Sequence, residues 1–156
     1  MARAHSTTAE ATQIGELASS VRLSVTRLAR ILRQQDGEGL TPSTTSALAM
    51  LNRSGPMTLG DLAAREHVAA PTVTRIVEKL QLAGLVTRRV SEHDGRVSYV
   101  EITEEGRRLI GDVRSRRTRW LVEHFEGLSP ADVETLRQAA PILERLVEQA
   151  AREEEP

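Results

Sequence analysis

The chain of 156 residues contains no cysteine and only one residue each of tryptophan, tyrosine and phenylalanine. Without cysteine it cannot form a disulfide, a thiolate metal site or a thiol-based redox sensor. It has no run of about 18 apolar residues, which a membrane-spanning helix requires. Residues 1–13 are polar and lack the apolar stretch of a secretory signal. We therefore expect a cytoplasmic protein that does not associate with membranes.

Motifs for catalysis and metal binding are also missing. The four histidines, at positions 5, 67, 93 and 124, lie far apart, and no two have the i,i+4 spacing of ligands on one helix. The chain has no nucleophile elbow, no phosphate-binding loop, and no carboxylate pair with independent support for acid–base chemistry. We predict that the protein is not an enzyme and holds no metal ion or cofactor. The same histidine spacing disfavours the alternative of a zinc sensor.

Charge is distributed unevenly along the chain. From Trp120 to Pro156 there are nine acidic residues and three arginines, a balance of −6. The net charge is −1, so the rest of the chain carries +5. A basic body beside an acidic segment is consistent with one part that faces nucleic acid and one that avoids it. An acidic tail that only improves solubility is the alternative.

Apolar periodicity, caps and turn residues predict six helices and one β-hairpin. Residues 1–10 are small and polar without periodicity and are expected to be disordered. Thr41 with Pro42, and Thr58 with Asp61, have the spacing of helix N-terminal caps. The predicted elements are helices over 11–35, 42–52, 59–66, 71–83, 104–125 and 130–152, and strands over 85–90 and 97–102.

The first and last helices carry apolar stripes that a small central domain cannot cover. We predict a helical dimerisation region over 11–35 and 104–152, followed by an acidic tail at 153–156. Burial of the stripes in a second copy is favoured over packing on the core of a monomer. The predicted dimerisation residues are Ile14, Leu17, Val21, Val133, Leu136, Leu143 and Val147.

Six arginines between positions 107 and 119 do not share one face of the predicted fifth helix. We expect a solvated surface with salt bridges. Two alternatives are pairing with acids of the last helix across a dimer, and a contribution to an effector cleft.

Residues 41–103 have the order helix, turn, helix, hairpin of a winged helix-turn-helix domain. The fold class we predict is therefore mostly α with a small β-hairpin wing. Hydroxyls and an arginine lie on the first turn of the helix that opens at Pro71, where they can approach phosphates and base edges. Arg96 at the hairpin tip can enter a minor groove, oriented by Asp94, although Asp94-Gly95 also simply forms a turn. The predicted DNA-contacting residues are Pro71, Thr72, Val73, Thr74, Arg75, Lys79, Arg88, Arg89, His93, Asp94 and Arg96.

Three stretches carry a specific resemblance: the helix-turn-helix over 59–75, LAGLVTRR at 82–89, and DGRVSYVEITEEG at 94–106. With them the chain resembles the MarR (multiple antibiotic resistance regulator) family of bacterial transcription regulators over about residues 11–152. The resemblance implies a homodimer on a pseudo-palindromic operator of double-stranded DNA. Thr72, Thr74 and Arg75 would read the major groove, and Arg96 the minor groove. Gly95 departs from the family, where a second basic residue is common, so the wing is expected to be less positive.

The resemblance also implies a repressor that a small molecule releases from DNA. Arg88 matches a position where an arginine contacts aromatic carboxylates in some relatives, which suggests an anionic, phenolic effector. A phosphate contact or a charge at the strand edge is the alternative for Arg88. Two other functions stay open: a DNA-binding protein without an effector, and a winged-helix module that binds only proteins.

Overall fold

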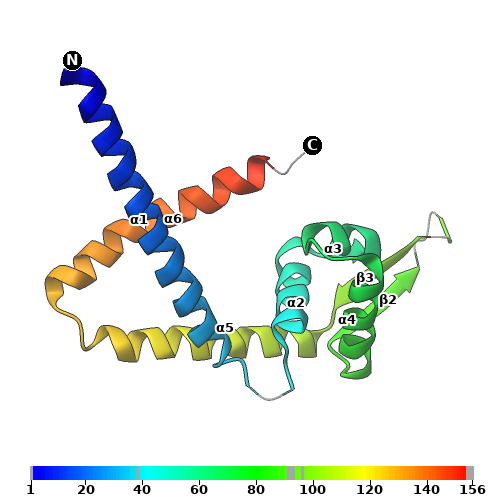
Figure 1. The fold of residues 1–156 in the computed structure, drawn as a ribbon. Helices are drawn as coiled ribbons and strands as arrows, with labels where there is room; N and C mark the ends of the chain where they lie inside the picture. The colour runs from blue at the N-terminus through cyan, green and yellow to red at the C-terminus, as the bar shows by residue number, and fades with distance from the viewer. Residues whose placement is uncertain (1, 38, 91–93, 96, 154–156) are drawn as a thin grey trace. The chain divides into compact units, whose positions relative to one another are not determined.

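The computed structural model describes residues 2–37, 39–90, 94–95 and 97–153, with the backbone alone for 2–11 and 151. Within these residues the order of elements is α1, α2, β1, α3, α4, β2, β3, α5 and α6, and Figure 1 labels all of them except β1. The chain divides into two compact units, and the boundary between them falls between Arg117 and Thr118, inside α5. The predicted fold class, mostly helical with a small hairpin wing, is confirmed. Within the described residues, none of the helices combines the length and apolarity needed to cross a bilayer.

Helix α1 spans Ala2–Arg33 and begins nine residues before the predicted start. The structure describes residues 2–10 as part of this helix, whereas their composition predicts disorder. Alanine recurs at positions 2, 4, 9 and 11, and no glycine or proline precedes Gly15. Alanine has the highest intrinsic helix propensity. Residues 2–10 can therefore extend the helix although they carry no apolar stripe.

Helices α2 (Pro42–Ser54) and α3 (Leu59–Arg65) begin where the sequence predicts. The side chain of Thr41 accepts a hydrogen bond from the Thr44 amide at 3.3 Å, and that of Thr58 accepts one from the Asp61 amide at 3.1 Å. In both cases the third helical residue bonds back to the cap, which completes a capping box. Two otherwise unpaired donors are thus satisfied at each helix start.

The sheet has three strands in the order β1-β3-β2, all antiparallel. Strands β2 (Val86–Val90) and β3 (Ser98–Ile102) form the predicted hairpin. The sequence did not predict β1 (Met57–Thr58), in which Met57 pairs with Val100. A strand of two residues has no periodicity to detect, and its pairing depends on a residue 43 positions away.

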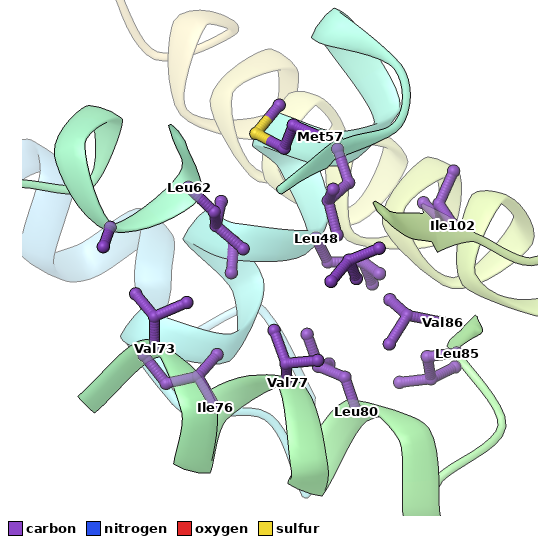
Figure 2. Close-up of a cluster of buried hydrophobic side chains, with 14 residues drawn as sticks. Leu48, Met57, Leu62, Val73, Ile76, Val77, Leu80, Leu85, Val86 and Ile102 are labelled. Atoms are coloured by element: carbon purple, nitrogen blue, oxygen red, sulfur yellow. The ribbon is translucent and has the colours of Figure 1, made fainter. Parts of the chain in front are cut away.

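A single apolar core holds α2, α3, α4 (Ala70–Leu82) and the sheet together. Figure 2 shows the α4 side chains pointing into the interior that Leu48 and Leu62 also fill. These two leucines are completely buried. Truncating a buried leucine of this kind to alanine costs about 2–5 kcal/mol. The position of α4 is therefore set by packing across several elements.

Helix α5 (Glu104–Phe125) has the predicted bounds and starts in close contact with the end of α4. The Thr103 hydroxyl donates to the Gly84 carbonyl at 2.7 Å and accepts from the Gly106 amide at 3.1 Å. A Cβ on Gly106 would lie 2.3 Å from the Leu85 carbonyl oxygen. Thr103 and Gly106, at the end of the DGRVSYVEITEEG stretch, thus form a tight junction between the hairpin and α5.

The second unit contains the end of α5 and helix α6 (Pro130–Glu153). Ser129 caps α6, because its hydroxyl oxygen accepts from the Asp132 amide at 3.2 Å. The helix continues through Pro141 without a restart. Residues 154–156 of the predicted acidic tail lie outside the described residues.

Candidate nucleic-acid interface

Helix α4 has one buried face and one polar, exposed face. Val77 and Leu80 lie in the core, at 0% and 2% exposure. On the opposite face Thr72, Arg75 and Lys79 are exposed, as the predicted groove-reading surface requires. Because the core holds the inner face, the outer residues are presented on a rigid helix.

Two predicted contacts on this helix differ from the simple expectation. Val73 is only 1% exposed, so its inclusion among the DNA-contacting side chains was wrong: it belongs to the stripe that anchors α4. Thr74 is half-buried, and its hydroxyl donates to the Ala70 carbonyl at 3.0 Å. A hydroxyl oxygen keeps acceptor capacity when its hydrogen is engaged, so Thr74 can accept a hydrogen bond but has no free proton to offer.

The N-terminus of α4 lacks the side-chain cap that α2 and α3 possess. Its N-cap residue is Ala69, whose side chain cannot accept a hydrogen bond, and Pro71 has no amide hydrogen. The Thr72 amide donates to the Ala69 backbone carbonyl at 2.9 Å. The first amides of a helix have no intrahelical partners, and the helix dipole places partial positive charge at this end. An uncapped, exposed N-terminus beside Thr72 is suited to a phosphate oxygen.

The turn between α3 and α4 is compact. His67 adopts a φ of 50°, the left-handed region that non-glycine residues seldom occupy. The Val68 amide then donates to the Ala63 carbonyl at 3.1 Å, which closes the turn onto α3. This geometry sets the angle at which α4 leaves α3.

The wing contributes a second group of basic side chains. Arg88 and Arg89 are exposed on β2, opposite Val100 and Tyr99 of β3. Arg75, Lys79 and these two arginines thus belong to one compact unit and are all exposed. His93 and Arg96, predicted wing contacts, lie outside the described residues, while Asp94 and Gly95 lie within them.

A cavity of about 600 Å³ is lined by residues of α1, α2, α5 and the turn after α3, and none of these basic side chains is among them. Its wall combines apolar side chains such as Leu32, Val68 and Ile110 with polar and charged ones such as Ser46, Glu66 and Arg117. Thr45 is also a lining residue; it is only 4% exposed, and its buried hydroxyl has no hydrogen-bond partner among the described residues. An unsatisfied buried hydroxyl costs about 1–3 kcal/mol. Arg88, the predicted effector contact, is not among the residues that line this cavity.

Two arginines of α5 hold the end of α1. Arg117 forms a bidentate pair with Asp36, with its Nε and Nη2 each 2.7 Å from a carboxylate oxygen. Arg116 donates from Nε to the Gln35 carbonyl at 2.9 Å and from Nη2 to the Asp36 carbonyl. Asp36 is 5% exposed, and removing one partner of a buried pair costs about 3–5 kcal/mol.

This clamp corrects our expectation that the arginines of α5 form a solvated surface. Arg107 and Arg108 do so, through i,i+3 pairs with Glu104 and Glu105. The partner of Arg117 lies 81 residues earlier, in a DGEG stretch that appears as an ordinary helix stop. No local spacing in the sequence indicates that Asp36 is buried.

Comparison with known proteins supports the family resemblance and the fold. The MarR family model matches residues 40–98, which include α2, α3, α4 and β2. An uncharacterized HTH-type transcriptional regulator of Mycobacterium leprae is 37% identical over 135 residues, 86% of this chain and 94% of the relative. The HTH-type transcriptional repressor MdtR of Bacillus subtilis is 26% identical over 144 residues, 89% of this chain and 91% of the relative.

A solved structure shows the same architecture. The MarR family protein from Bacillus stearothermophilus superposes with a TM-score of 0.74 at 26% identity, covering 87% of this chain and 96% of its own. The likeness therefore extends beyond the helix-turn-helix to most of the chain.

Proposed function

Because the chain belongs to the MarR family of transcriptional regulators, we propose that it is a homodimeric repressor that a small molecule releases from a pseudo-palindromic operator. The observation that carries the DNA contact is the construction of α4. Its inner face is locked in the core, its outer face offers Thr72, Arg75 and Lys79, and its N-terminus has no side-chain cap. We propose that this end of α4 receives a phosphate while Arg75 reaches a base edge or a second phosphate.

The terminal helices support a dimer. Ile14 and Leu17 on α1 are 67% and 64% exposed, and Val147 on α6 is 70% exposed. Apolar side chains at regular helical positions gain about 1.5–3 kcal/mol each when a partner buries them fully. In such a dimer two α4 helices separated by roughly 34 Å would enter successive major grooves.

The proposed repression and release have their own support. The similar protein MdtR is named a repressor, which favours that role over activation. The cavity beside the α1–α5 clamp offers a place for an effector, since it has the size of a small-molecule site and a lining of apolar, polar and charged side chains. A ligand changes operator affinity only if it binds the DNA-competent and DNA-incompetent forms unequally.

The first test is to sequence the genomic fragments that the immobilised protein retains and to measure affinity for the strongest one. Arg75→Ala should weaken that affinity by about 1–3 kcal/mol if the side chain reads a base. If it contacts a phosphate, the loss of affinity should be the same for all DNA sequences. The slope of log affinity against log salt concentration should then fall in magnitude by about one.

Arg137→Ala on α6 is the matched control, because it removes the same charge from an exposed arginine outside the winged domain. Equal affinity for retained fragments and random competitor DNA would contradict the proposal, and binding that is insensitive to salt would favour a protein-interaction module.

A further inference from the structure

We infer that Glu78 determines which duplexes α4 accepts, because its carboxylate opposes binding to DNA except where a cytosine amine meets it. This inference rests on the proposed function, since it concerns the DNA contact of the same helix. It assigns part of the discrimination between DNA sequences to an acidic side chain on a surface that is otherwise basic.

Glu78 lies in a row of residues that faces directly away from the core. With about 3.6 residues per turn, positions 71, 75, 78 and 82 fall on one side of α4. The buried Val73, Val77 and Leu80 fall on the other side and point into the core (Figure 2). All four residues of the outward row are exposed. If this side of α4 enters a major groove, Glu78 therefore approaches the bases together with Arg75.

The carboxylate of Glu78 has no ion-pair or hydrogen-bond partner in the part of the chain that the structure describes. On α5 two exposed glutamates do pair with an arginine three residues later, Glu104 with Arg107 at 3.5 Å and Glu105 with Arg108 at 3.1 Å. In α4 the order is reversed, because the arginine comes first, and such a pair is less favourable on a helix. The charges of Arg75 and Glu78 are therefore both available to a partner molecule.

An unpaired carboxylate on this surface lowers the affinity for DNA in general. A duplex carries one negative charge per about 1.7 Å of its axis, so the phosphates on both sides of the groove repel Glu78. Most polar atoms that base pairs present in the major groove are hydrogen-bond acceptors, which also oppose a carboxylate. A helix that bound only phosphates would be weakened by this glutamate at every site.

Cytosine offers the group that a carboxylate requires. Its N4 amine donates into the major groove, and aspartate and glutamate are the side chains that accept from it. Guanine presents two acceptors that suit an arginine. Arg75 and Glu78 are separated by about 4.5 Å along the helix, little more than the roughly 3.4 Å rise of one base pair. A guanine and a cytosine in the same or adjacent pairs can therefore satisfy both charges.

The other polar residues of α4 can bind the backbone without competing for these bases. Thr72 and Lys79 lie to one side of the outward row, where they can reach the phosphates of one strand. Leu82, at the end of the row, is 90% exposed and has no group that binds phosphate. Contacts that hold any duplex and contacts that distinguish one sequence from another thus belong to different lines of residues.

The first experiment compares the wild type with Glu78→Gln on the strongest genomic fragment and on random duplexes. Glutamine keeps the size and the acceptor oxygen of the side chain but removes its charge. The affinity for random duplexes should rise severalfold, and the slope of log affinity against log salt concentration should steepen by up to about one. The ratio of specific to random affinity should fall about tenfold, the equivalent of one lost base contact.

Glu105→Gln is the matched control. It removes the same charge from the same compact unit, but from a carboxylate that is already paired with an arginine. It should change both affinities alike and leave their ratio as in the wild type. Thermal unfolding of each variant checks that the fold is kept, which the exposed position of Glu78 predicts.

The second experiment changes the bases. C·G pairs in each half of the strongest fragment are replaced one at a time by T·A, which exchanges the N4 donor for an O4 acceptor. At one position the wild type should lose about tenfold or more in affinity. Glu78→Gln should lose less than about threefold there, because its amide can donate to O4 as well as accept from N4.

The outcomes separate this inference from the proposed function. If Glu78→Gln binds random duplexes no better than the control does, the carboxylate does not oppose DNA and the inference is wrong. If no C·G position distinguishes glutamate from glutamine, the cytosine contact is wrong. In both cases the proposed DNA binding stands, provided that the wild type prefers its fragment over competitor and Arg75→Ala weakens it. A wild type without that preference would refute the proposed function, and the role of Glu78 with it.

Discussion

Helices α4 and α6 carry similar apolar stripes, but the side chains of the two stripes are buried to different extents. Val77 and Leu80 of α4 are buried by α2, α3 and the sheet, whereas Leu143 and Val147 of α6 are 42% and 70% exposed. Amphipathic periodicity determines that a helix has an apolar face, but not which surface covers it. The comparison teaches that α4 is stabilised within one chain, whereas the apolar face of α6 is left exposed, as the dimer we propose requires.

The largest effect should come from placing a charge in the α6 stripe. In the proposed dimer Leu143→Asp removes two buried leucines, each contributing about 1.5–3 kcal/mol, so association should be lost. Sedimentation equilibrium should then give 17.2 kDa rather than twice that mass. Gln138→Asp is the control, because it adds the same charge to an exposed position off the stripe. A wild-type mass of 17.2 kDa would itself refute the dimer.

In α4 the corresponding change should act on folding. Leu80→Ala should lower the free energy of unfolding by about 2–5 kcal/mol, because it leaves a cavity in a packed core. Urea denaturation at several protein concentrations measures this loss, which should not depend on concentration if the core lies within one chain. A shift smaller than that of an exposed control, Leu82→Ala, would mean that α4 is not anchored as described.

Two glycines of α5 sharpen the contrast between packed and open positions. Gly106→Ala should destabilise the fold by about 1–3 kcal/mol, because its Cβ would overlap the Leu85 carbonyl. Gly111, on the same helix, has open space around it, so Gly111→Ala should stabilise by about 0.5–1 kcal/mol. Thermal unfolding should show shifts of opposite sign. Shifts of the same sign would argue against the tight junction.

The smallest effect concerns the missing cap of α4. Ala69→Ser should stabilise the protein by about 1 kcal/mol, because the serine hydroxyl can accept a hydrogen bond from the Thr72 amide. The same change should weaken operator binding, since it occupies donors that we assign to a phosphate. Ala83→Ser, at the other end of α4, is the control. If operator affinity rises together with stability, α4 does not bind phosphate through its N-terminus.

Local chemistry explains which parts of the fold were predictable. The side chains of Thr41 and Thr58 each accept a hydrogen bond from the amide three residues later. Because these contacts are local, both helix starts could be located from the sequence. The exposed face of α4 followed from its 3.6-residue period, apart from Val73, which that same period assigns to the core. Strand β1 depends on a partner far along the chain and could not be found in this way.

The least predictable feature is the clamp in which Arg117 of α5 forms a bidentate pair with the buried Asp36. An aspartate in a DGEG stretch is typical of an exposed turn, and an arginine on a polar helix is typical of a solvated surface. Only folding brings these charges together and removes the aspartate from water. Their pairing is therefore a consequence of tertiary structure.

By itself the amino-acid sequence determined the helices, their caps, the hairpin and the family, because each depends on interactions a few residues apart or on a contiguous motif. The tertiary structure alone decided which apolar faces are covered, where the cavity lies, and which charges are buried together. Those properties depend on contacts between residues distant in sequence, and burial changes the free energy of a charge or hydroxyl far more than its neighbours in the chain do.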